Sequence, residues 1–246
     1  MSDIQLYRVI EPQFERTNIE VDTNHRELSA RIKFTRFYSP IFDLVVLFWK
    51  ETGVQIGTAV YLLSHIENYL GAVEAAIQSQ EIDFSLNRFF ANEQVKSIPL
   101  LKIYQYMAGY LEVLKELHRP PTSEWEQYIW EYLWEKERVE SFADEPSRQT
   151  CLFAFGNLQD LKMYMQEREA EPTVKNETQI CIVEMKEIYA LKKYDSRWLD
   201  NLPCETATYN TYLIASRNYW SGKKSKKPLM EYLFHGKYTL KVLELK

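Results

Sequence analysis

The chain has 246 residues, of which 46% are hydrophobic and 14% aromatic, and its formal net charge is -5. This length and composition suffice for one large domain with a buried core, and the acidic balance gives no whole-molecule attraction for nucleic acid. Only seven glycines are present, which argues against a loop-rich or all-β protein and favours substantial helix.

The cysteines and the apolar runs indicate the compartment. Cys151, Cys181 and Cys204 are odd in number and lack C-x-x-C spacing, which argues against a disulfide framework and against zinc. Cys151 and Cys181 lie in apolar strand-like runs, where buried packing is the expected role. The first residues do not resemble a signal peptide, and the longest apolar run, Phe42–Trp49, is too short to cross a bilayer. We therefore expect a cytoplasmic protein with no membrane partner.

The first part of the chain predicts one strand and then a block of helices. Residues 5–10 read as a strand that Pro12 ends. Ala30–Phe34 alternates like a strand, but residues 13–37 are polar with scattered apolar positions and are left unassigned. From about 39 to 140 the pattern is helical, beginning with a cap at Ser39 and a proline in the first turn. Further helices are expected at 57–78, at 99–118 and at 122–142, the last with a capping box at Ser123 and Glu126.

The remainder of the chain alternates between strands and helices. We expect strands at 150–155, 178–186, 188–193, 228–236 and 238–245, the last two joined by a turn at His235-Gly236. Helices are expected at 157–169, with Asn157 as the N-cap, and at 206–220. The predicted fold class is therefore α+β, as one domain over residues 1–246 with a large helical insertion at about 39–140.

Common catalytic motifs are absent from the sequence. It contains no G-x-G-x-x-G, Walker loop, H-E-x-x-H or G-x-S-x-G, and its four histidines lack metal-ligand spacing, so we expect no metal site.

Three short segments remain as candidates for chemistry. They are Tyr7-Arg8 in the first strand, Ser147-Arg148 with Thr150 within SFADEPSRQTCLFAF, and Glu231 in a late strand. The plain alternatives are a surface arginine, a turn serine after a proline, and a glutamate on the exposed face of an edge strand. Glu231 alternates with Leu229 and Leu233, and a carboxylate on a leucine face costs free energy unless it is paired or functional.

The order of these segments resembles the ADP-ribosyltransferase-like superfamily in its Arg-Ser-Glu form. The matching pieces are YRV, PSRQTCLF and EYLFHG, and they bracket nearly the whole chain. The resemblance implies NAD as substrate, bound in a cleft of a split two-sheet β core. It assigns Arg8 to the NAD phosphates or ribose, with Arg148 as a second candidate for the diphosphate. It assigns Ser147 to orienting the nicotinamide ribose and supporting the catalytic glutamate. It assigns Glu231 to bonding a ribose hydroxyl and stabilising the oxocarbenium-like state.

Two departures from the family pattern limit what carries over. The middle motif is Ser-Arg-Gln-Thr where the family has Ser-Thr-Ser, which weakens the assignment of Thr150. Arginine-modifying members carry a second glutamate two residues before the catalytic one, and this chain has Leu229 there. The pattern therefore disfavours transfer to protein arginines.

A basic segment precedes Glu231. Lysines beside stackable rings suit a phosphate backbone and an unstacked base, and in the superfamily the segment before the glutamate strand contacts the acceptor. The alternative is a solvated basic loop. The residues assigned here to the acceptor are Tyr219, Trp220, Lys223, Lys224, Lys226 and Lys227.

The leading hypothesis is an NAD-dependent ADP-ribosyltransferase, a glycosyltransferase that modifies nucleic acid in preference to protein. By analogy within the superfamily it would act as a toxin or phage-defence (antiviral) effector, restrained by an antitoxin partner. Two alternatives stay open: an NAD glycohydrolase with water as acceptor, and a non-catalytic binding module on the same fold.

Overall fold

The computed structural model describes residues 4–24, 30–79, 100–118, 128–169, 178–203 and 206–244, with side chains from residue 38 onward in the second of these ranges. Cys204 and the capping box predicted at Ser123 and Glu126 lie outside them. The chain divides into two compact units. Unit 1 comprises residues 1–29, 135–201 and 215–246, and unit 2 comprises residues 30–134 and 202–214.

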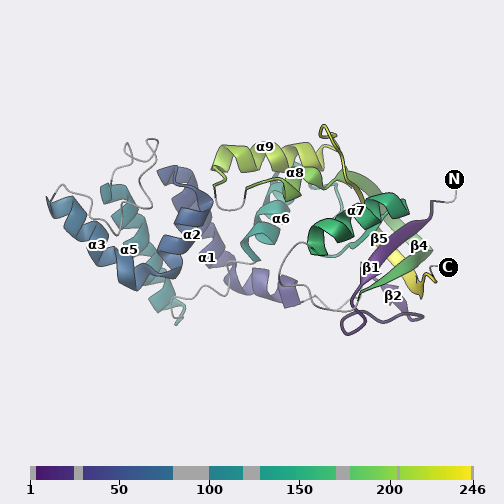
Figure 1. The fold of residues 1–246 in the computed structure, drawn as a ribbon. Coiled ribbons are helices and arrows are strands. Elements are labelled where there is room, and N and C mark those ends of the chain that lie inside the picture. Colours follow the sequence, from purple (N-terminus) through teal and green to yellow (C-terminus); the bar gives the residue numbers. More distant parts are fainter. Residues whose placement is uncertain are drawn as a thin grey trace. The chain divides into compact units, whose positions relative to one another are not determined.

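Unit 1 is built on an antiparallel sheet of five strands (Figure 1). The strands are β1 (Leu6–Ile10), β2 (Glu20–Asp22), β3 (Leu152–Phe155), β4 (Gln179–Asp195) and β5 (Met230–Val242). Their order is β2-β5-β3-β1-β4, and β5 also pairs with β4, so β1, β3, β5 and β4 form a closed ring. Strands and helices therefore coexist as predicted, and the α+β class is confirmed.

The two faces of this sheet carry different cores. Alternate residues such as Leu6, Ile10 and Leu152 point into the ring, because successive strand side chains point to opposite faces. The opposite face of β3 packs against α7 (Leu158–Glu169) through a second apolar cluster. The predicted N-cap is confirmed, since the Asp160 amide donates to Asn157 Oδ1 at 2.8 Å.

Strands β4 and β5 are each continuous, which corrects the prediction of two strands in each place. The expected turn at His235-Gly236 is wrong, because β5 runs straight through it beside β4. Gly236 pairs with Ile188, between two register shifts in β4. A Cβ built at Gly236 would lie 2.0 Å from the Glu187 carbonyl oxygen. Glycine is thus needed for close backbone approach at a bulge, not for a turn.

Unit 2 is helical. It contains α1 (Ala30–Thr52), α2 (Ile56–Ser64), α3 (Ile66–Ser79), α5 (Leu100–Glu116) and the first turns of α6 (Ile129–Ser141) and α9 (Tyr209–Trp220). Helices α3 and α5 run side by side, and α1 also packs on α5 (Figure 1). Unit 1 holds the rest of α6 and α9 together with the short α8 (Arg197–Asp200). None of the described helices is both long and apolar enough to cross a membrane.

Two predictions about these helices are wrong, and one segment left unassigned is now placed. Residues 30–34, which alternate like a strand, are helical, because five alternating residues are too few to decide a period and the segment continues into α1. Pro40 lies inside α1, not in its first turn, and leaves one backbone carbonyl without its helical donor. The helix expected at 57–78 is two helices, because His65 leaves helical geometry at φ -117° and ψ 34°.

Residues 202–214 join unit 2, although the sequence pattern did not assign them to the helical block. The indole Nε1 of the fully buried Trp49 donates to the Ala207 carbonyl at 3.2 Å. The Tyr212 hydroxyl donates to the Leu133 carbonyl at 2.6 Å. These bonds tie a late segment of the chain to helices that lie far earlier in sequence.

We predict that Gly236→Ala destabilises the protein by about 1–3 kcal/mol, because the new methyl group overlaps the backbone of β4. The matched control is Gly71→Ala in α3, where a Cβ would meet nothing within 4 Å. That change is expected to stabilise by about 0.5–1 kcal/mol, since glycine is unfavourable within a helix. Urea unfolding followed by circular dichroism measures both, and equal effects would contradict the bulge argument.

Candidate functional site

Glu231 is a buried carboxylate on the outer face of the ring. Glu231 is 6% exposed, and Leu229 and Leu233 on the same face are fully buried. Across the sheet it pairs with Phe155 on β3 and with Tyr194 on β4. An exposed glutamate on an edge strand is therefore excluded. A charge in this position requires compensation from its neighbours.

Arg148 and Tyr219 supply that compensation. Arg148 Nη1 donates to Glu231 Oε1 and, at 2.6 Å, to the Tyr219 hydroxyl. The Tyr219 hydroxyl in turn donates to the same Glu231 oxygen at 2.5 Å. The guanidinium also lies over two rings, 4.5 Å from the centre of Phe153 and 5.1 Å from that of Tyr219. The loop before β3, helix α9 and strand β5 thus meet at one ion pair.

The loop that carries Arg148 is held by a second set of polar contacts. Glu135 accepts hydrogen bonds from Arg138 and, at 2.9 Å, from the Ser147 hydroxyl. Arg138 Nη1 also donates to the carbonyls of Ala143 and Glu145. Ser147 therefore contacts Glu135 on α6, and its predicted contact with Glu231 is not made.

Thr150 is likewise turned away from Glu231. Its hydroxyl donates back to the Ser147 carbonyl at 3.4 Å, and its amide bonds the same carbonyl at 3.2 Å. These are the contacts of a turn that leads into β3. The structure thus gives Thr150 a local role.

Tyr194 on β4 completes the site and was missed from the sequence. Its ring stacks on Tyr219 at 4.8 Å, and its hydroxyl donates to Glu145 in the Arg148 loop. Burial raises the pKa of Tyr219 well above its ordinary range, and burial together with the Glu145 carboxylate raises that of Tyr194. Both hydroxyls therefore remain protonated donors at neutral pH. Tyr194 was missed because it follows two lysines and precedes an aspartate, and this partly polar sequence matches no motif that would single it out.

Arg8 is not part of this cluster. Tyr7 pairs across β1–β3 with Phe155, the residue that pairs with Glu231, so Tyr7 and Glu231 share a sheet face. Arg8 follows Tyr7 and therefore points to the opposite face. There it donates to both carboxylate oxygens of Glu15 and, at 2.7 Å, to the Phe153 carbonyl. The structure places Arg148 beside Glu231 instead.

The four lysines before Glu231 are exposed, whereas the two aromatic residues predicted to stack beside them are not. Tyr219 is fully buried and Trp220 is 2% exposed, so neither ring offers a face to a nucleotide base. Their predicted acceptor role is not available in this structure, because both rings pack within unit 1 against Tyr194. A half-buried ring that the sequence did not single out, Trp198, lies beside Lys223 instead.

Two further features bear on chemistry. Cys151 and Cys181 are buried and free, as predicted. Burial raises the pKa of Cys151 to about 12, so this thiol is unreactive at neutral pH.

A hollow of about 500 Å³ runs along α7 and is lined by Leu158, Gln159, Lys162, Met163 and Gln166. Glu231 is not among these residues.

The chain belongs to a family described as proteins of unknown function, DUF2441, whose model matches residues 58–244. The matched range contains Ser147, Arg148, Tyr219 and Glu231, and it begins after Arg8. Comparison with curated proteins gave no match.

We predict strong energetic coupling between Arg148 and Glu231. Arg148→Met should cost about 3–5 kcal/mol, because it leaves a buried carboxylate without its partner. Adding Glu231→Gln should restore part of that loss, since the unpaired charge is then gone. Lys115→Met, from an ion pair whose side chains are 63% and 67% exposed, is the control and should change stability by less than about 1 kcal/mol. Additive effects of the two site substitutions in urea unfolding would contradict a coupled pair.

We also predict that stability declines in alkali. Tyr219 ionises near its ordinary pKa of 10 when unfolded but not when folded, so above pH 10 the unfolded state binds fewer protons. The free energy of unfolding should then fall by about 1.4 kcal/mol per pH unit for this residue. Urea unfolding from pH 8 to 11 measures the slope, and Tyr219→Phe should make it shallower. An unchanged slope in that variant would contradict the burial effect.

Proposed function

We propose that this protein uses NAD as a substrate, releases nicotinamide and transfers ADP-ribose to a macromolecule, with Glu231 as the catalytic carboxylate. The observation that carries the proposal is the buried Glu231 at the start of β5, with an arginine and a tyrosine on one of its oxygens. A carboxylate held in a fixed position with little water around it suits the stabilisation of a developing positive charge.

The positions of the three sequence segments support the proposal at the level of topology. Tyr7-Arg8 lies on β1, Ser147-Arg148 precedes β3, and Glu231 begins β5, with β3 between the other two strands. A split two-sheet core of the ADP-ribosyltransferase type is the finer fold assignment that we propose. A toxin or phage-defence role with a restraining antitoxin rests on the same resemblance.

The proposed step breaks the bond between the ribose C1′ carbon and the nicotinamide nitrogen. The electron pair leaves with nicotinamide, which is neutral after departure because its ring nitrogen is cationic in NAD. Positive charge develops on the ribose, and the Glu231 carboxylate stabilises it. An oxygen or nitrogen of the acceptor then bonds to C1′ and loses its proton to solvent.

Arg148 has two tasks in this proposal. In the structure its guanidinium donates a hydrogen bond to Glu231 and forms an ion pair with it. A diphosphate accepts the planar fork of an arginine well, so NAD binding would draw Arg148 from Glu231 to the phosphates. That exchange would free the carboxylate for the ribose.

A non-catalytic module on the same fold is the second candidate, and the Arg148–Glu231 pair itself favours it. A carboxylate neutralised by an arginine is also a plain structural ion pair. The two candidates differ in one observable, because a non-catalytic module releases no nicotinamide under any condition.

We predict that Glu231→Gln lowers nicotinamide release by about 10²–10³ while NAD still binds, because the ground state carries no sugar cation. Glu184→Gln is the control, since that glutamate lies in ion pairs on β4 with Lys186 and Lys241. The assay uses NAD labelled in nicotinamide and in adenine, with separate pools of RNA, DNA and protein. Adenine label retained by a pool identifies the acceptor, and free ADP-ribose without any pool identifies a glycohydrolase. Equal turnover by Glu231→Gln and wild type would refute the role of Glu231.

We predict further that Arg148→Lys weakens NAD affinity more than Arg8→Lys. Each substitution keeps the positive charge, but lysine cannot offer the two parallel donors that suit a diphosphate. Arg148 lies beside Glu231, whereas Arg8 is bound to Glu15 on the other sheet face. Calorimetric titration with NAD ranks the two variants. A larger loss with Arg8→Lys would return the diphosphate contact to the first strand.

A further inference from the structure

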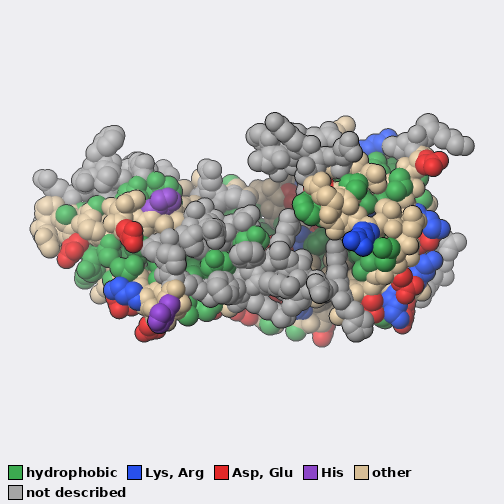
Figure 2. Space-filling view, turned by 90° about the horizontal axis from the view of Figure 1, so that it is seen from below, with side chains coloured by type: hydrophobic (Ala, Val, Ile, Leu, Met, Phe, Trp, Pro, Cys, Tyr) green, Lys and Arg blue, Asp and Glu red, His purple; other side chains and the backbone are tan. Residues whose placement is uncertain are grey.

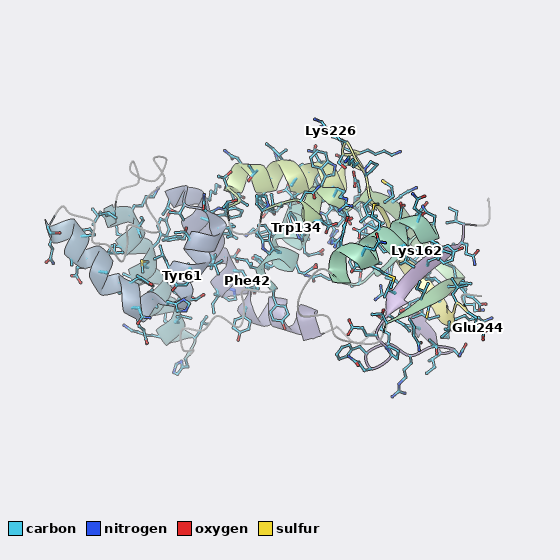
Figure 3. All side chains as sticks on the ribbon, viewed as in Figure 1. Phe42, Tyr61, Trp134, Lys162, Lys226 and Glu244 are labelled. Atoms are coloured by element: carbon cyan, nitrogen blue, oxygen red, sulfur yellow. The ribbon has the colours of Figure 1, made fainter. Side chains whose placement is uncertain are left out.

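We infer that residues 221–229, here called the lysine loop, form a binding surface for single-stranded nucleic acid. The loop joins α9 to β5 and presents Lys223, Lys224, Lys226 and Lys227, all of them exposed. Figure 3 shows Lys226 projecting outward from this loop. Within the described residues, none of the four ammonium groups forms an ion pair with a carboxylate.

This arrangement contrasts with the charges on the sheet. There, Lys237 pairs with Glu187 at 2.6 Å, and Lys241 pairs with Glu184. Figure 2 shows acidic and basic side chains intermingled over the strand-rich part of the molecule. The positive charge of the lysine loop is therefore local, on a chain whose net charge is -5.

The lysine loop is fixed by hydrogen bonds to its backbone. The fully buried Asp195 accepts hydrogen bonds from the amides of Ser225 at 2.6 Å and Leu229 at 2.9 Å. The indole Nε1 of Trp198 donates to the Lys223 carbonyl at 2.7 Å. A loop pinned at three places holds its lysines together, so their charges act on one ligand with little loss of backbone entropy on binding.

The composition of the surface favours a phosphate backbone over other polyanions. Lysine is depleted at protein–protein interfaces, where aromatic residues and arginine prevail, so an acidic protein is the weaker fit. The sequence SGKKSKKP has no large apolar side chain to enter a lipid bilayer. Phosphates, by contrast, need only the point charges that lysines supply. The half-buried ring of Trp198, whose centre lies 5.8 Å from Lys223 Nζ, is placed where an unpaired base could stack.

The position of the loop connects it to the site at Glu231. Leu229, whose amide is held by Asp195, is two residues before Glu231, and Asp195 lies opposite Met230 across the β4–β5 pairing. A strand bound on the lysine loop would thus lie near the reacting ribose. That it is the acceptor rests on the proposed function, whereas the binding itself does not.

Binding is measured by fluorescence anisotropy with a labelled 16-nucleotide RNA and a DNA of the same sequence, each single-stranded and as a duplex. The protein of residues 1–246 is used without NAD, so that no transfer can occur and binding is independent of catalysis. Replacing the four loop lysines with glutamine should weaken binding at least tenfold and make the salt dependence shallower. Four contacts of about -0.7 each correspond to a log–log slope of about -2.8.

The matched control replaces Lys50, Lys102, Lys115 and Lys186 with glutamine, which changes the net charge equally. Trp198→Ala should lower affinity for single strands several-fold at every salt concentration, and Trp198→Phe should retain most of it. The inference is overturned if both quadruple variants bind alike, or if the duplex binds as well as the single strand. Anionic vesicles binding in place of RNA and DNA would also overturn it. If the oligonucleotide binds through the loop but the wild-type protein releases no nicotinamide from NAD, the surface stands and the proposed enzymatic function fails.

Discussion

The structure of unit 1 depends on the neutralisation of one buried carboxylate. Glu231 lies between two buried leucines, and only the hydrogen bonds from Arg148 and Tyr219 make a charge tolerable there. These two residues come from the loop before β3 and from the end of α9. The requirement to pair one charge thus fixes a loop and a helix against the same strand, and the Tyr194–Tyr219 stack extends the fixed region to β4.

A second buried carboxylate organises the neighbouring surface. Asp195 uses its two oxygens to hold the amides of Arg197, Ser225 and Leu229, which satisfies backbone donors at the end of one strand and the start of another. Because these anchors lie under the lysine loop, the exposed charges above them belong to an ordered segment. Buried acids thus serve two purposes in unit 1, one beside the proposed reaction and one beneath the proposed binding surface.

The pairing of Arg148 with Glu231 sets the chemistry that the site can support. One oxygen of Glu231, Oε1, already accepts two hydrogen bonds, from Arg148 and from Tyr219. A ligand that offered Arg148 another anion would free this oxygen, and in the proposed function the diphosphate of NAD is that anion. The same pairing directs the proposed diphosphate contact to the loop before β3 and away from the first strand, where Arg8 is bonded to Glu15.

The sequence by itself determined the α+β class, most of the elements and the burial of Cys151 and Cys181, because these follow from local periodicity. It also determined the Asn157 cap from capping chemistry, and it marked Glu231 as a candidate because a carboxylate among leucines costs free energy. Tertiary structure alone decided the rest. The registers of β1 on β3 and of β3 on β5 put Arg8 on the face opposite Glu231. Pairing with β4 carried β5 through Gly236, and packing buried Tyr219 and Trp220 while leaving Trp198 half-buried. Each of these depends on contacts between residues far apart in the chain, which no local pattern encodes.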